Sequence, residues 1–419
     1  MRINPKLKQG FRRFRHQKRA FYSLIGLLIV FLCTLPAELL CNSRPILFHK
    51  SGRWYFPVLF DYSEKELGGQ RHVNADYRSP AFWRRIGCDP VTAGLDVLEK
   101  AESETGASAD NESAEDILDM FDSPESDPGP ASTPAPATPK AEQKEDLAEC
   151  WALWPPVRYD YAYIETDTRV GRSALVAPWP HRVPGTEKVI PSGWLDGHYL
   201  GTDNRGRDIL ARLVYGLRVS LIFGLLLAVS STIVGAALGA VQGFFAGWID
   251  LLGQRLTEIW GSLPRLYLLM ILSSLLARNI IVLFVILNLT SWMGMAAYMR
   301  AEFLKGRNLD YVRAARALGV RNSGIMFRHI LPNSMTPIIT FFPFAVTGGI
   351  LALVSLDFLN LGVPSPFPSI GELLRQGQAN LHATWIIIPA FIVLSGTITM
   401  LTFIGDGLRN AFDPRKAAG

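Results

Sequence analysis

Long runs of apolar residues constrain this chain more than any other feature of its sequence. A transmembrane helix needs about 20 consecutive apolar residues, and such runs recur along the chain. The mean hydropathy is +0.18 and 49% of the 419 residues are hydrophobic, more than an ordinary soluble protein of this charge carries. We therefore predict an all-α polytopic membrane protein with six spans, at about 21–40, 217–247, 254–277, 280–300, 334–357 and 385–405.

The third span has the least regular start. Asp250, Arg255 and Glu258 surround its beginning, and Pro264 removes a backbone donor inside it. We expect the helix to kink or to restart at that proline.

Basic residues set the orientation. The N-terminus, 1–20, carries eight lysines and arginines and no acidic residue, so the positive-inside rule places it in the cytoplasm. The first helix, 21–41, is longer than the apolar part of a signal peptide and lacks a clear cleavage site, which favours a permanent helix. Six spans return the tail, 406–419, to the cytoplasm and place 42–208 in the periplasm.

The periplasmic segment changes composition along its length. Aromatic residues are frequent at both ends, which predicts a small folded layer with strands. Between them, 89–149 is rich in Asp, Glu, Ser, Ala, Pro and Thr and cannot bury enough apolar surface to offset its ordering entropy. We predict a disordered acidic insertion there, which either binds a partner or, more simply, solvates itself.

Two cysteines, Cys88 and Cys150, stand at the edges of this insertion. In an oxidising periplasm they could close it with a disulfide. Cys41 is the competing partner, and Cys33 lies inside the first span. No cysteine spacing resembles a metal site.

Small residues recur on one face of the second span. Gly235, Gly239, Gly243 and Gly247 are four residues apart, a spacing that lets another helix approach closely. This row is either a subunit or pore-lining interface or an internal helix contact.

A structured basic loop, 301–333, separates the fourth and fifth spans. Asp310 can cap a short helix and Gly319 can end it in a left-handed conformation; Pro332 limits a second one. A helix-turn-helix that binds DNA has similar spacing, but the flanking spans leave no room for a duplex, which excludes nucleic acid as a partner. We predict a docking surface for a cytoplasmic protein.

Charged residues also surround the outer ends of the spans. Asp203, Arg205, Arg207 and Asp208 could bind a cation or a receptor, but a salt-bridged turn is the simpler interpretation. Asp357, at the end of the fifth span, is best interpreted as a loop anchor.

The cytoplasmic loop resembles the signature of permease subunits of ATP-binding-cassette importers, in which Glu-Ala-Ala is followed by Gly and then by Ile-x-Leu-Pro. Here Arg313 replaces the glutamate before Ala314 and Ala315, and Gly319 and 330–332 complete the pattern. Motifs of the oligopeptide and dipeptide branch also occur, at 201–208, 356–364, 371–372 and 405–414. The segments 12–20 and 51–59 are similar to the permeases of microcin C and antimicrobial-peptide uptake systems.

This resemblance implies a type I importer fold in the bacterial inner membrane, with a five-helix core at 209–405 and an enlarged periplasmic domain. It implies a second homologous permease, a periplasmic peptide-binding protein and a cytoplasmic ATPase that binds ATP and Mg²⁺; this chain has no phosphate-binding loop and no cofactor of its own. The residues that would couple to the ATPase are Arg313, Ala314, Ala315, Arg316, Leu318 and Gly319.

A secondary, ion-coupled transporter is the alternative. Such proteins carry ionisable residues near the bilayer midplane, and the second and sixth spans have none there. A catalytic role is not expected, because no Ser/His/Asp or paired-carboxylate arrangement stands out.

Overall fold

The computed structural model describes residues 5–412, except 70, 91, 95–149, 165–174, 183–188, 191, 195–196 and 277–278. Most of the predicted acidic insertion, 89–149, therefore lies outside the described residues. The chain forms two compact units, a larger one of Met1–Asn42 and Tyr159–Gly419 and a smaller one of Ser43–Arg158.

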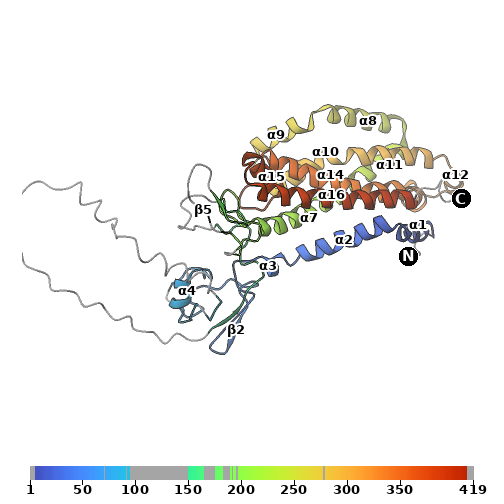
Figure 1. Cartoon of the computed structure of the whole chain (residues 1–419). Coiled ribbons are helices and arrows are strands. Elements are labelled where there is room, and N and C mark those ends of the chain that lie inside the picture. The colour runs from blue at the N-terminus through green and yellow to red at the C-terminus, as the bar shows by residue number, and fades with distance from the viewer. Residues whose placement is uncertain are drawn as a thin grey trace, which may run out of the picture. The chain divides into compact units, whose positions relative to one another are not determined.

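The larger unit is a helical bundle (Figure 1). Its main helices are α1 (Pro5–His16), α2 (Lys18–Thr34), α3 (Ala37–Leu40), α7 (Ile209–Phe245), α8 (Gly247–Ser262), α9 (Arg265–Leu275), α10 (Ile280–Ser291), α11 (Met293–Gly306), α12 (Asp310–Ala317), α14 (Met335–Phe358), α15 (Ile370–Ala379) and α16 (Thr384–Phe412). Between α12 and α14 lie α13 (Asn322–Gly324), the π-helix η2 (Ile325–Ile330) and the 3₁₀-helix η3 (Leu331–Asn333). Two short strands, β4 (His181–Arg182) and β5 (Val189–Ile190), pair antiparallel.

The longest helix, α7, begins eight residues before the predicted span. The carboxylate of Asp208 accepts a hydrogen bond from the backbone N–H of Ala211 at 2.7 Å and so caps the helix, before its continuous apolar run begins. The helix ends at Ala246, whose φ of 52° is left-handed and stops the α-helical hydrogen bonds. Gly247 follows with φ 57° and starts α8.

Four helices of the described residues are long and apolar enough to cross a membrane, and up to five if the bent pair α1–α2 counts as one span. They are Ile209–Phe245, Ile280–Gly306, Met335–Phe358 and Thr384–Phe412. The predicted third span, 254–277, is instead divided between α8 and α9, which meet at Pro264. The proline restarts the helix there because it cannot donate the backbone hydrogen bond of a continuous helix.

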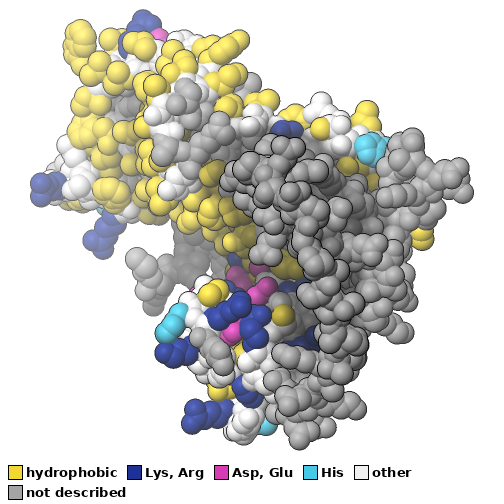
Figure 2. Space-filling model, turned by 90° about the vertical axis from the view of Figure 1, so that its left-hand side faces the viewer, with side chains coloured by type: hydrophobic (Ala, Val, Ile, Leu, Met, Phe, Trp, Pro, Cys, Tyr) yellow, Lys and Arg dark blue, Asp and Glu magenta, His cyan; other side chains and the backbone are white. Residues whose placement is uncertain are grey.

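The core of the bundle surrounds α7, which packs along both α11 and α14. On the α14 side, Ile209, Leu213 and Leu217 of α7 share one buried cluster with Val354 and Ile386 of neighbouring helices. Apolar side chains also cover much of the described surface (Figure 2), as a surface that faces lipid requires.

The smaller unit contains a three-stranded antiparallel sheet in the order β2 (Arg53–Tyr55), β1 (Leu47–Lys50), β3 (Trp151–Leu153), and the helix α4 (Pro80–Arg85). Phe48 of the central strand is fully buried against Phe82 and Trp83 of α4. The description of the chain as all-α is therefore wrong, whereas the strands predicted for the aromatic ends of this segment are confirmed, because short aromatic segments pair around the core formed with α4.

Cys88 and Cys150 form a disulfide in the smaller unit, and both are buried. The bond spans 62 residues of sequence and joins the two edges of the insertion. Cys33 and Cys41 are free.

Candidate functional site

Three of the four predicted glycines form a tight contact between α7 and α11. A methyl group at Gly235, Gly239 or Gly243 would overlap the carbonyl oxygens of Trp292, Ala296 and Arg300, respectively. These carbonyls are themselves four residues apart, so the two helices match turn for turn. The row therefore packs inside this chain.

Gly247 does not belong to this row. It lies beyond the end of α7, nothing would contact an added Cβ within 4 Å, and its φ is +57°. Its glycine identity follows from backbone conformation, because L-residues rarely adopt a positive φ.

The basic loop, α12 to η3, is attached to the ends of α7 and α11 by an apolar inner face. Val312 is fully buried and Ala315 is 6% exposed. Both belong to a cluster with Phe244 of α7 and Met299 and Phe303 of α11. The inner face fixes the loop to the helix pair that the glycines hold together.

The opposite face of α12 is open. Ala314, Arg316 and Gly319 are exposed, Leu318 is 84% exposed, and the Arg313 side chain is 69% exposed. An exposed leucine at the end of a charged helix costs apolar hydration unless a partner covers it. Of the six predicted coupling residues, only Ala315 faces inward.

The end of α12 has the geometry of a Schellman motif. The backbone N–H of Val320 donates to the carbonyl of Ala315 at 3.1 Å, and that of Gly319 to Arg316 at 3.0 Å. Gly319 adopts φ +77°, which this motif requires. Arg316 also lies with its guanidinium carbon 5.9 Å from the ring centroid of Phe244. The exposed residues therefore belong to a defined turn.

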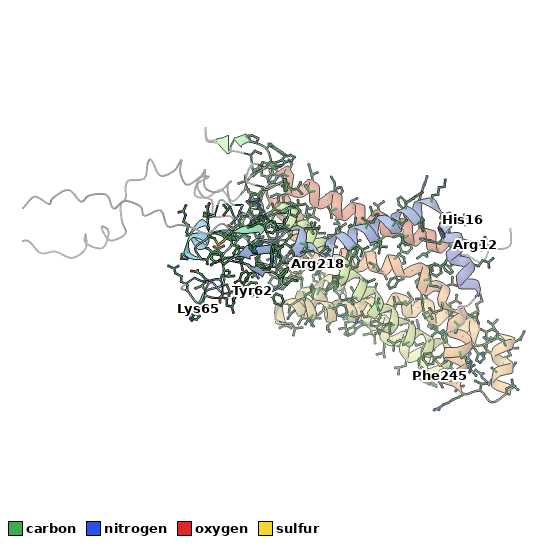
Figure 3. All side chains as sticks on the ribbon, turned by 90° about the horizontal axis from the view of Figure 1, so that it is seen from below. Arg12, His16, Tyr62, Lys65, Arg218 and Phe245 are labelled. Atoms are coloured by element: carbon green, nitrogen blue, oxygen red, sulfur yellow. A yellow bond between two sulfur atoms is a disulfide. The ribbon has the colours of Figure 1, made fainter. Side chains whose placement is uncertain are left out.

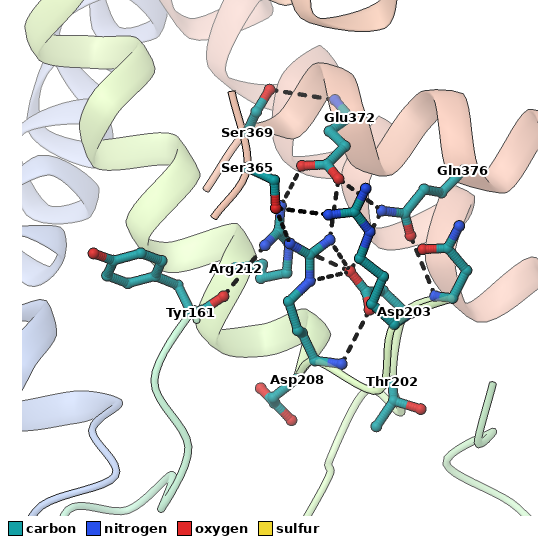
Figure 4. A network of polar contacts seen from close by, with 12 residues as sticks. Tyr161, Thr202, Asp203, Asp208, Arg212, Ser365, Ser369, Glu372 and Gln376 are labelled. Atoms are coloured by element: carbon teal, nitrogen blue, oxygen red, sulfur yellow. Dashed lines mark hydrogen bonds and ion pairs between the residues drawn. The ribbon is translucent and has the colours of Figure 1, made fainter. Parts of the chain in front are cut away.

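At the opposite end of the bundle, a buried network of charged side chains joins the turn before α7 to α15 (Figure 4). Arg207 donates through Nε to Asp203 at 2.8 Å and through Nη2 to Glu372 at 3.0 Å. Arg212 donates to Glu372 at 2.5 Å, and Gln376 donates to it at 3.1 Å. Asp203, Arg207 and Arg212 are each at most 1% exposed, so the network is shielded from water.

The pKa values of the two carboxyls follow from this network. Burial alone would raise the pKa of Asp203, but the hydrogen bond from Arg207 and the charges of Arg207 and Arg212 hold it below its usual value. Burial would also raise the pKa of Glu372, and Arg212 and Arg207 lower it. Two ionised carboxylates thus balance two guanidiniums.

The turn at 201–208 is salt-bridged, as its simpler interpretation predicted. Asp203 forms an ion pair with Arg207. Asp208 caps α7, and its Oδ2 lies 2.9 Å from Nδ1 of His198. Arg205 is exposed and donates to Ser365 at 2.7 Å. The two aspartates have separate partners and do not converge on a cation. Among the residues that the structure describes, no group of three or more His, Cys, Asp or Glu could hold a metal ion.

Asp357 anchors the loop after α14, also as predicted. Its carboxylate accepts hydrogen bonds from Ser369 Oγ at 2.5 Å and from the backbone N–H of Val363 at 2.9 Å. A methyl group at Gly362 would overlap this carboxylate, so the loop folds back closely over it.

Sequence reasoning missed Arg212 and Gln376 as members of this buried network. Arg212 falls before the apolar run that marked the second span, and its partner Glu372 is 160 residues away. The available signal was an unexplained arginine beside a membrane helix, because such a charge needs a partner when it is buried.

Comparisons with known proteins identify relatives of the whole chain and a family match in its C-terminal half. Residues 219–418 match the family of binding-protein-dependent transport system inner membrane components. The peptidoglycan transport system permease protein YejE of Agrobacterium fabrum is 37% identical over 422 residues, which cover 99% of this chain and 94% of that protein. The inner membrane ABC transporter permease protein YejE of Escherichia coli is 36% identical over 416 residues and 99% of each chain.

Permeases named for peptides match a little more than half of the chain. The oligopeptide transport system permease protein OppC of Haemophilus influenzae is 36% identical over 247 residues, which cover 57% of this chain and 79% of that protein. Among solved structures, the inward-facing MetNI methionine ABC transporter has 14% identity and a TM-score of 0.43, and covers 49% of this chain and 98% of the matched one.

Proposed function

Because the chain belongs to the inner-membrane permeases of binding-protein-dependent ABC transport systems, in the branch of the oligopeptide and dipeptide permeases, we propose that it forms half of the translocation path of an ATP-driven peptide importer. One observation carries the coupling role. The loop α12 to η3 is fixed by Val312 and Ala315 to the ends of two membrane helices, while Leu318 on its outer side is open to a partner.

The proposed topology has six passages. α7, α10–α11, α14 and α16 are the four long apolar helices, and we add α2 and the broken pair α8–α9. α2 has 17 residues, the lower limit of about 17 for a spanning helix. With the basic N-terminus in the cytoplasm, this path places α1 and α12 at the inner face and α15 at the outer face, which agrees with their opposite positions in Figure 1.

The partners are an ATPase subunit, a second homologous permease and a binding protein that delivers the substrate. ATP and Mg²⁺ belong on the ATPase, and this chain transmits movement to the path through α12. The relatives are named for oligopeptide, dipeptide and peptidoglycan transport, so the substrate class is short peptides, including those attached to cell-wall fragments.

The decisive experiment replaces Leu318 by aspartate in the assembled transporter. Leu318 is 84% exposed, so this change leaves the fold of the loop intact while it places a charge on the proposed contact. We expect the variant to bind the ATPase subunit at least about tenfold more weakly, because residues at the centre of an interface contribute this much to binding. ATP hydrolysis stimulated by the binding protein should fall by a similar factor. Ala315 is unsuitable for this test because it is buried, and aspartate there would disrupt the loop itself.

Leu381→Asp is the matched control. Leu381 is 76% exposed in the turn between α15 and α16, at the outer end of the bundle. This variant should capture the ATPase normally. If Leu318→Asp assembles and is stimulated like the native chain, the proposed coupling surface is wrong.

A further inference from the structure

The basic N-terminal helix α1 has no role in the transport cycle proposed above. Its segment Gln9–His16 meets α2 at 92°, so it turns across the direction of α2 and does not lengthen it. Figure 3 shows Arg12 and His16 on α1 beyond this bend. If α2 crosses the bilayer, a helix at a right angle to its end lies along the membrane surface.

Apolar contacts hold α1 in this position. Phe14 is 5% exposed and belongs to a buried cluster with Ala20 of α2 and Ile404 and Ala411 of α16. The ring of Phe11 lies edge-on to Phe412, with the centroids 5.8 Å apart. The helix is therefore fixed across the ends of α2 and α16 without the use of its charges.

Four exposed cations of this region have no carboxylate partner among the described residues. Arg12, Arg15, Lys18 and Arg19 are exposed, and none of them forms an ion pair within the part of the chain that the structure describes. An arginine of another helix is paired: Nη1 of Arg218 in α7 lies 2.9 Å from a carboxylate oxygen of Glu38. The charges around α1 thus point outward on both sides of the bend.

We propose that α1 is a lipid-binding helix whose exposed cations bind the phosphate groups of anionic phospholipids in the cytoplasmic leaflet. The inference rests on the proposed topology. Charge complementarity favours this occupant, because the cytoplasmic leaflet is negatively charged and basic residues beside a spanning helix are attracted to it. Phe11, still 57% exposed, lies where an apolar side chain would enter the boundary between headgroups and acyl chains.

An acidic protein surface would suit these charges less well. The cations lie on α1 and at the start of α2, on both sides of a right-angle bend. If α2 spans the bilayer, this bend lies at the membrane surface, so the cations lie at the level of the lipid headgroups. Lipid bound there would fix the inner ends of α2 and α16 relative to each other, because Phe14 contacts both helices.

The test compares the full-length chain in neutral detergent micelles with a triple variant, Arg12→Gln, Arg15→Gln and Arg19→Gln. Fluorescence polarisation measures the binding of phosphatidylglycerol and phosphatidylcholine that carry the same fluorescent acyl chain. The native chain should prefer phosphatidylglycerol by about tenfold or more, since each basic residue near the headgroups contributes about fivefold. The triple variant should lose most of this preference, and 500 mM salt should reduce it in the native chain, about 500 mM being enough to shorten the screening length below 5 Å.

A variant with the same loss of charge is the control. Lys305→Gln, Arg321→Gln and Arg328→Gln remove three exposed cations of the 301–333 loop and should keep the preference. If the variant with Arg12, Arg15 and Arg19 replaced retains the preference, or if it loses ATPase binding while lipid binding is unchanged, α1 does not bind lipid as proposed. Since lipid binding is measured on the chain alone, this result is separate from the ATPase test of Leu318.

Discussion

Replacement of Gly239 by alanine should be among the most damaging single-methyl changes in the bundle. The added methyl would overlap the carbonyl oxygen of Ala296 on α11 and would also crowd the backbone nitrogen of Arg300. Backbone atoms cannot rotate away as side chains can. The two helices must therefore separate, and Gly235 and Gly243 would lose their contacts with the same helix.

The size of the effect follows from two opposing terms. An ordinary approach between carbon and a carbonyl oxygen is about 3.3 Å, so the helices must move apart by roughly 1 Å. Overpacking of this kind costs about 1–3 kcal/mol. Alanine stabilises a helix over glycine by about 0.5–1 kcal/mol, which offsets only part of that cost.

Gly294→Ala measures the helix preference of alanine over glycine without overpacking. Gly294 lies in α11 with no atom within 4 Å of an added Cβ, so its substitution should leave the free energy of unfolding unchanged or raise it slightly. Thermal unfolding of the solubilised chain, followed by tryptophan fluorescence, compares the two variants. Equal stabilities would show that α7 and α11 are not held by close backbone contact.

Three further predictions concern the buried network of charged side chains and the smaller unit. Arg212→Gln should lower stability by about 3–5 kcal/mol because it leaves a buried carboxylate short of its partner, whereas exposed Arg205→Gln should cost about 1 kcal/mol or less in the same thermal unfolding assay. The pKa of Asp203 is lower in the folded than in the unfolded chain, so the stability that its carboxylate contributes is present above the unfolded pKa of about 3.9 and is lost as the pH falls toward the folded pKa. Asp203→Asn should therefore flatten the acid side of the curve of unfolding free energy against pH. An unchanged slope there would contradict this. Loss of the bond between Cys88 and Cys150 releases a loop of 62 residues and should destabilise the smaller unit by about 4 kcal/mol, seen as faster proteolysis of the Cys88→Ser, Cys150→Ser variant than of a Cys33→Ser control.

The sequence alone predicted the ends of helices correctly where a single glycine or proline determines the backbone conformation. Gly319 ends α12 in a left-handed conformation, and Pro264 separates α8 from α9, both at the residues where the sequence indicated a change. The salt-bridged turn at 201–208 also follows from neighbouring charges, because Asp203 and Arg207 are only four residues apart.

Pairings between distant segments could not be predicted in the same way. The apolar and small residues of α12 gave no indication that Ala315 faces inward, since its burial depends on Phe244 and Phe303 from two other helices. The right-angle bend before α2 was equally hidden, because the basic residues on either side of it read as one continuous positive segment. Hydrophobic spacing identifies a helix but not the neighbour against which it packs.

The same contacts determine how a displacement of the loop α12 to η3 can reach the opposite end of the bundle. α7 has 37 residues and is about 55 Å long. Gly239 and Phe244 fix one end of it to α11 and the loop α12 to η3, and the buried pair of Arg212 and Glu372 fixes the other end to α15. A displacement of the loop therefore cannot be absorbed by α7 alone, because both ends are held by contacts that tolerate little change. α8, by contrast, buries no side chain in this chain and lies beyond the left-handed break at Ala246. Relative motion should concentrate at that break, with α7, α11 and α15 moving as one body.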